Sequence, residues 1–74
     1  MIYNYRTLLR KEPEGGYTVF IPSLPGCISY GETMEESIKN IKEAVELYIE
    51  TKNELGEEIP TEEETFEYNI KVEV

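Results

Sequence analysis

The stretch YTVFIPSLPGCISYGETMEE, residues 17–36, decides the fold of this chain. Its first five residues, 17–21, carry apolar side chains on both faces, which predicts a strand inside a sheet. Pro22 ends that strand because proline has no amide hydrogen to donate to a neighbouring strand. The proline and glycine that follow suit a tight turn, and residues 27–31 predict a short third strand.

The end of the same stretch predicts a helix. Thr33-Met34-Glu35-Glu36 is a capping box, in which the hydroxyl and the last carboxylate each bond a free amide at a helix start. Apolar residues then recur at alternating steps of four and three, at Met34, Ile38, Ile41, Val45 and Tyr48. Gly56 is well placed to stop the helix. We therefore expect a helix from about Met34 to Leu55, with Thr33 as its N-cap.

Outside this stretch the pattern predicts two more strands. Residues 2–11 alternate and lead into a polar turn with Pro13 and two glycines, which predicts a hairpin with the strand at 17–21. Residues 57–65 form a charged connection. The last nine residues place Phe66, Tyr68, Ile70, Val72 and Val74 on one face, which predicts a half-buried strand.

The expected architecture is a single α+β domain, residues 1–74, with the order β-β-β-α-β. A meander makes the third strand parallel to the first, and a right-handed crossover through the helix makes the fourth parallel to the third. The fourth strand can then pair beside the first. This predicts a sheet in the order 3-2-1-4 with the helix packed on one face.

The charge balance excludes several classes of function. The chain has 16 acidic residues, all of them glutamate, against 7 basic ones, and a formal net charge of −9. Nucleic-acid surfaces need clustered Lys and Arg, so we expect no direct nucleic-acid partner. An acidic surface instead attracts a basic partner. With no histidine and one cysteine, we expect no metal site and no cofactor.

Other candidate sites have plainer explanations. Glu62, Glu63 and Glu64 are adjacent in sequence, so their carboxylates diverge into solvent and do not converge as an acid–base pair must. Cys27 has no histidine to activate it and is expected to be a structural thiol. The six tyrosines are expected in the core or at a protein interface, because stacking platforms for nucleic acid lie in positive grooves. We therefore expect no catalytic residues and no enzyme activity.

Size and composition give three further expectations. A chain of 74 residues leaves apolar surface uncovered, so we expect a homodimer or higher homo-oligomer. No apolar stretch is long enough to span a membrane and no leader is recognisable, so we expect a soluble cytoplasmic protein without a membrane partner. The many Glu, Lys and Ile residues and the lack of Gln favour a thermophilic source.

Residues 17–27 and the segment Gly31-Glu32-Thr33-Met34-Glu35-Glu36-Ser37, followed by Asn40, strongly resemble the HicB antitoxin family. Its pattern there is I-P-D-L-P-G-C, a short strand and G-D-T-x-E-E-A, and Leu55–Pro60 resembles its later L-G-x-x-I-P segment. Ser23 and Glu32 stand where the family has Asp. The resemblance implies a partial ribonuclease-H-like fold, in line with the predicted strand order.

The resemblance also implies a function, which is to neutralise a HicA toxin by occupying its active site. That toxin is a small basic ribonuclease of double-stranded-RNA-binding fold that degrades mRNA. The alternative is a stand-alone homo-oligomeric binding or structural domain with no toxin partner. A degenerate metal nuclease is a distant third possibility, because the chain has no Asp to hold the metal ions.

Within the family motif, the turn after the second strand is the expected partner-binding site. Its residues are Pro22, Leu24, Pro25 and Gly26. A rigid turn loses little entropy when it docks against a partner. The alternative, of equal weight, is that this turn only reverses the chain.

Overall fold

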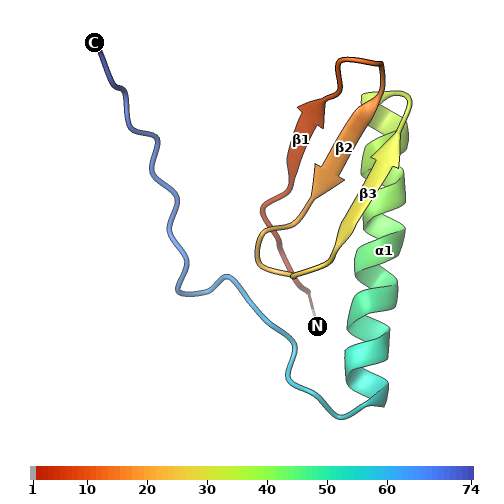
Figure 1. Ribbon diagram of the computed structural model, residues 1–74. Helices are drawn as coiled ribbons and strands as arrows, with labels where there is room; N and C mark the ends of the chain where they lie inside the picture. The colour runs from red at the N-terminus through yellow and green to blue at the C-terminus, as the bar shows by residue number, and fades with distance from the viewer. Residues whose placement is uncertain (1) are drawn as a thin grey trace.

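The computed structural model describes residues 2–74, so Met1, the first residue of the predicted domain, lies outside the described residues. Three strands are followed by one helix: β1 (Leu8–Lys11), β2 (Tyr17–Phe20), β3 (Ile28–Gly31) and α1 (Met34–Glu54). The strands form one antiparallel sheet in the order β1-β2-β3, and α1 packs across one face of it (Figure 1). The predicted α+β class is confirmed.

The core lies between β2 and α1. Five buried apolar side chains form it: Val19, Ile21, Leu24, Cys27 and Ile41. Tyr5, Leu9, Ala44, Val45 and Tyr48 pack around them. Val19 is opposite Leu9 on β1 and Ser29 on β3, so the row through these three residues faces the helix. The alternation of strand side chains then places Leu8, Phe20 and Ile28 on the open face.

The helix begins where the capping box predicts. Thr33 is the N-cap, and its hydroxyl accepts a hydrogen bond from the amide of Glu36 over 3.0 Å. The Glu36 carboxylate accepts from the amide of Glu32 over 3.3 Å, one residue earlier than in a reciprocal capping box. Leu55 is the C-cap and Gly56 follows with φ at +68°, a conformation that favours glycine.

The predicted fourth strand, and with it the sheet order 3-2-1-4, is wrong for this structure. Residues 66–74 form no strand and run away from the sheet (Figure 1). The reason lies in the contacts of the preceding connection. The amide of Arg6, just before β1, donates to the Glu62 carboxylate, and the Arg6 side chain pairs with Glu67. These bonds fix Glu62 and Glu67 beside Arg6, and the rest of the segment 66–74 leads away from that point and does not run along β1.

The first strand is shorter than predicted, because regular pairing begins only at Leu8 and not at Ile2. Leu8 is opposite Phe20, so extending the register by two residues would place Arg6 opposite Pro22. Proline has no amide hydrogen and cannot continue the ladder. Residues 2–7 instead continue from β1 towards the end of α1 and line a groove against that helix (Figure 1).

Candidate partner-binding surface

The predicted partner-binding turn is tightly hydrogen-bonded. The amide of Leu24 donates to the carbonyl of Ile21 over 3.0 Å, and the amide of Cys27 donates to the carbonyl of Leu24 over 2.9 Å. Gly26 has φ at +85°, where a side chain would be strained. These bonds make the turn rigid, as a surface that docks at low entropic cost requires.

The four predicted residues divide into two groups. Pro22, Pro25 and Gly26 are exposed, whereas Leu24 is fully buried at 0% exposure and belongs to the core. The Leu24 side chain therefore holds the turn on the domain, and only the other three residues present surface to a partner. Their role in binding stays a prediction.

A groove of 440 Å³ adjoins this turn and was not predicted from the sequence. It lies between the Gly26 end of the turn and the second half of α1. Ile28, Leu47 and Leu55 line it, and each is at least 59% exposed. Large apolar side chains exposed beside one another are typical of a protein-binding surface. The turn and the groove form one continuous surface, called the turn groove below.

Cys27 touches the turn groove but offers it no reactive thiol. Its side chain is 5% exposed, and burial raises its pKa above the ordinary value. A raised pKa keeps the thiol protonated, and the nucleophilic form is the thiolate. The expected structural role of Cys27 agrees with its place in the core.

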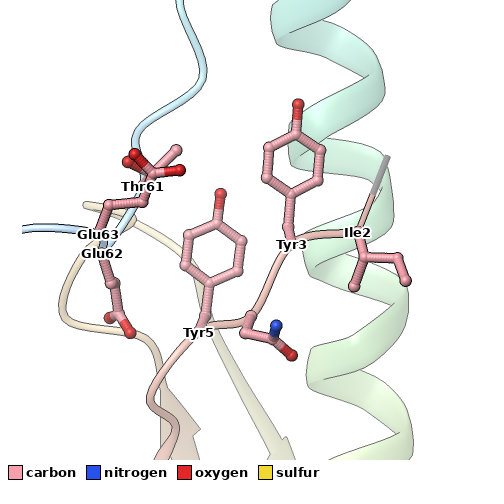
Figure 2. A pocket seen from close by; sticks show the side chains of 7 residues that line it. Ile2, Tyr3, Tyr5, Thr61, Glu62 and Glu63 are labelled. Carbon is pink, nitrogen blue, oxygen red and sulfur yellow. The ribbon is translucent and has the colours of Figure 1, made fainter.

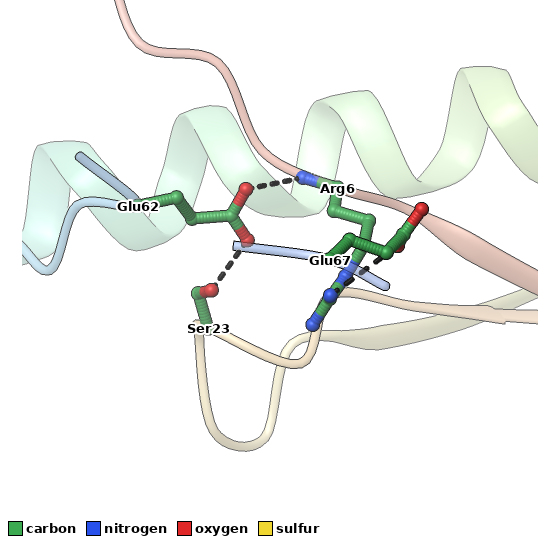
Figure 3. Close-up of polar contacts among 4 residues, drawn as sticks. All are labelled: Arg6, Ser23, Glu62 and Glu67. Atoms are coloured by element: carbon green, nitrogen blue, oxygen red, sulfur yellow. Dashed lines mark hydrogen bonds and ion pairs between the residues drawn. The ribbon is translucent and has the colours of Figure 1, made fainter. Parts of the chain in front are cut away.

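Glu62 fastens the connection after α1 to the sheet (Figure 3). One carboxylate oxygen accepts from the amide of Arg6 over 2.8 Å, and the other accepts from the hydroxyl of Ser23. The Ser23 hydroxyl, and then the Arg6 amide, hold the pKa of Glu62 below its ordinary value. The carboxylates of Glu62, Glu63 and Glu64 were all expected to point into solvent. For Glu62 this is wrong, because its two hydrogen bonds make it a structural anchor beside the turn.

A second contact fastens the same connection to the N-terminal segment. The Tyr5 hydroxyl donates to the carbonyl of Pro60 over 2.5 Å. The Tyr3 and Tyr5 rings are stacked with centroids 6.3 Å apart. Together with Thr61, Glu62 and Glu63 they border an open pocket of 520 Å³ (Figure 2). Burial, followed by repulsion from Tyr3 and Glu62, raises the pKa of Tyr5, so its hydroxyl keeps its proton and can donate.

The described residues contain no group of three or more Cys or Glu side chains placed to hold a metal ion. No helix in residues 2–74 is long and apolar enough to cross a membrane. The basic residues are scattered, and three of them pair with glutamates: Arg6 with Glu67, Arg10 with Glu12 and Lys52 with Glu57. The surface that remains is dominated by unpaired glutamates.

The fold and this surface define a small acidic α+β domain suited to binding another protein. Comparison with known proteins gives the family. The sequence model described as the HicB-like antitoxin of bacterial toxin–antitoxin systems matches residues 5–73. The chain belongs to the HicB-like antitoxin family. Membership supports an antitoxin role and implies, in general terms, a toxin partner and a non-enzymatic function.

Curated relatives share most of the chain. A UPF0150 protein of Synechocystis is 53% identical over 84% of this chain and 78% of its own length. A UPF0150 protein of Thermoplasma acidophilum is 43% identical over 76% of this chain and 81% of its own length. One of Archaeoglobus fulgidus is 40% identical over 65% and 70% of the two chains. The last two organisms are thermophilic.

Proposed function

We propose that this protein neutralises a small basic ribonuclease of the HicA type by docking over its active site. The match of the antitoxin family to residues 5–73 carries the proposal. The protein contributes no chemistry of its own in this account, and its effect is to exclude mRNA from the toxin. A stand-alone binding domain without a toxin is the alternative.

The turn groove is the surface best suited to that docking. It combines the rigid backbone at Pro25 and Gly26 with the exposed apolar side chains of Ile28, Leu47 and Leu55. Affinity at protein interfaces comes mainly from a few buried apolar and aromatic anchors, and exposed ion pairs contribute little each. We therefore assign the durable part of the binding free energy to these side chains.

Charge sets the rate of association. A net charge of −9 attracts a basic toxin over long range and raises the association rate constant. At 0.1 M salt, the attraction between exposed charges more than about 10 Å apart is largely screened. Higher salt should therefore slow association while leaving dissociation almost unchanged.

A binding titration with a catalytically inactive HicA-type toxin tests the proposal. Leu47→Glu should weaken binding by at least about tenfold, which corresponds to about 1.4 kcal/mol. Met34→Glu makes the same change, from a large exposed apolar side chain to a carboxylate, at the first residue of α1, about 20 Å along the helix from Leu47. Met34 lines neither groove, so this variant should leave the dissociation constant near that of the unchanged protein. Equal affinities for both variants would show that the toxin docks elsewhere.

We also propose that the protein forms a homo-oligomer, most simply a dimer. The sheet has one helix to cover two faces, and Leu8 on the open face and Ile38 on the helix side are 41% and 47% exposed. Small domains commonly cover such surface with a second copy. Light scattering at micromolar concentration would contradict this if it showed only the 8.6 kDa species.

A further inference from the structure

The C-terminal segment 66–74 has the alternating pattern of a strand but forms no strand in its own chain. Its five alternate apolar residues are at least 75% exposed: Phe66, Tyr68, Ile70, Val72 and Val74. Among the described residues, no hydrogen bond joins 68–74 to any other part of the chain. Burying an apolar side chain of this size stabilises a protein by about 1.5–3 kcal/mol relative to leaving it in water. The segment, called the tail below, therefore has the sequence pattern of a strand with one apolar face but no strand to pair with.

An apolar groove of 600 Å³ lies beside the unpaired edge of β1. Helix α1 packs mainly on β3 and β2, which leaves the helix-facing side of β1 uncovered. Tyr3, Tyr5 and Leu9 form one wall of this edge groove, and Ile38, Val45 and Ile49 of α1 form the other. Ile38 is 47% exposed.

The tail matches this groove in chemistry and in length. The helix wall from Ile38 to Ile49 spans roughly 17 Å at 1.5 Å per residue, which five or six residues of a strand would cover. A strand beside β1 would place alternate side chains in the edge groove. Its backbone would pair with peptide groups of β1 that face away from β2, which is the strand bonded to β1 within residues 2–74.

The tail of the same chain is held away from this groove. The amide of Thr65 donates to the carbonyl of Glu62 in a turn, and Glu67 pairs with Arg6 at 3.3 Å. Beyond these contacts the tail leads away from the sheet and from α1 (Figure 1). With these anchors in place, no residue of the tail lines the edge groove of its own chain.

We propose that the tail of each copy pairs along β1 of a second copy and fills that copy's edge groove. This deepens the proposed homo-oligomerisation and does not depend on any toxin. A two-fold axis would make the exchange reciprocal, as in most homodimers. Aromatic side chains bury about 150–250 Å² each, so the two phenylalanines and two tyrosines alone would bury a large part of a standard interface of about 1,600 Å².

Two matched tail variants test the proposal in the absence of toxin. Ile70→Lys places a charge on the apolar face and should raise the dimer dissociation constant by at least about tenfold, because two isoleucines leave the interface. Asn69→Lys makes the same change in charge on the polar face and should leave the dimer intact. Both residues are exposed in the single chain, so circular dichroism should show an unchanged fold.

Isotope-filtered NMR on a mixture of labelled and unlabelled copies identifies which tail fills the groove. We expect contacts between the methyl groups of Ile70 or Val72 in one copy and those of Leu9 or Ile38 in the other. Contacts only within one copy would overturn the exchange, as would a dimer in which the tail makes no such contacts. A dimer unaffected by Ile70→Lys would overturn the exchange but leave homo-oligomerisation standing, whereas a monomeric unchanged protein would overturn both.

Discussion

Gly31, Ser37 and Asn40 tie the end of β3 to the first turns of α1. A Cβ atom on Gly31 would lie 2.3 Å from the amide nitrogen of Ser37, so only glycine fits. Ser37 is fully buried, and its hydroxyl donates to the carbonyl of Met34 over 2.7 Å. The Asn40 side chain donates to the carbonyl of Tyr30 over 2.7 Å. These three motif residues therefore have structural roles.

We expect Gly31→Ala to destabilise the protein by about 1–3 kcal/mol, because the methyl group must push the backbone of α1 away from β3. Chemical denaturation measures this as a lower midpoint. Glu32→Ala, at the exposed neighbouring residue, should have a much smaller effect. An unchanged midpoint for Gly31→Ala would mean that β3 and α1 are further apart than described.

Glu62 makes a pH-dependent contribution to stability. Its folded-state pKa is lowered by Ser23 and Arg6, so the contribution is present above the unfolded value of about 4.3 and is lost as pH falls through the lower folded value. Glu62→Gln should flatten the fall of stability with decreasing pH that begins near the unfolded value. Glu63 makes neither of these bonds, so Glu63→Gln should keep the same slope of stability against pH as the unchanged protein. Identical slopes in all three proteins would exclude the Glu62 anchor.

The elements differ in how far the sequence predicts them. The start of α1 depends on Thr33 and Glu36, which lie within one turn, so local sequence suffices to place it. The strands 17–21 and 27–31 likewise appear within one residue of their predicted bounds. The tail also has a strand pattern, but a strand needs a partner, and the pattern at 66–74 cannot say whether its own chain supplies one. The Glu62 anchor was missed because it joins residues far apart in sequence.

Thr33→Ala tests the helix start. Loss of the hydroxyl leaves the Glu36 amide without its acceptor and should destabilise the protein by about 1 kcal/mol. Thr33→Ser keeps the hydroxyl and should retain most of the stability. Thermal or chemical denaturation of the two variants provides the comparison, and equal losses would mean that the hydroxyl does not act as the cap.

At the scale of the whole molecule, charge has opposite effects on two kinds of association, with a second copy and with a basic toxin. Two copies with a net charge of −9 repel each other, so salt should tighten the homodimer. A basic toxin is attracted, so salt should weaken that complex. The edge groove and the turn groove involve different residues. Ile38, Val45 and Ile49 of α1 line the edge groove, whereas Leu47 and the C-cap residue Leu55 line the turn groove, so the same copy has surface for both.

The rescue of toxin-arrested cells tests the central claim most directly. A HicA-type toxin would be induced together with this protein, with Leu47→Glu or with Met34→Glu, and growth and mRNA decay would be followed. We predict that the unchanged protein and Met34→Glu restore growth and stabilise mRNA, and that Leu47→Glu does so poorly at equal protein level. Arrest and mRNA decay that continue despite abundant unchanged protein, with no complex recovered at low salt, would contradict the antitoxin function.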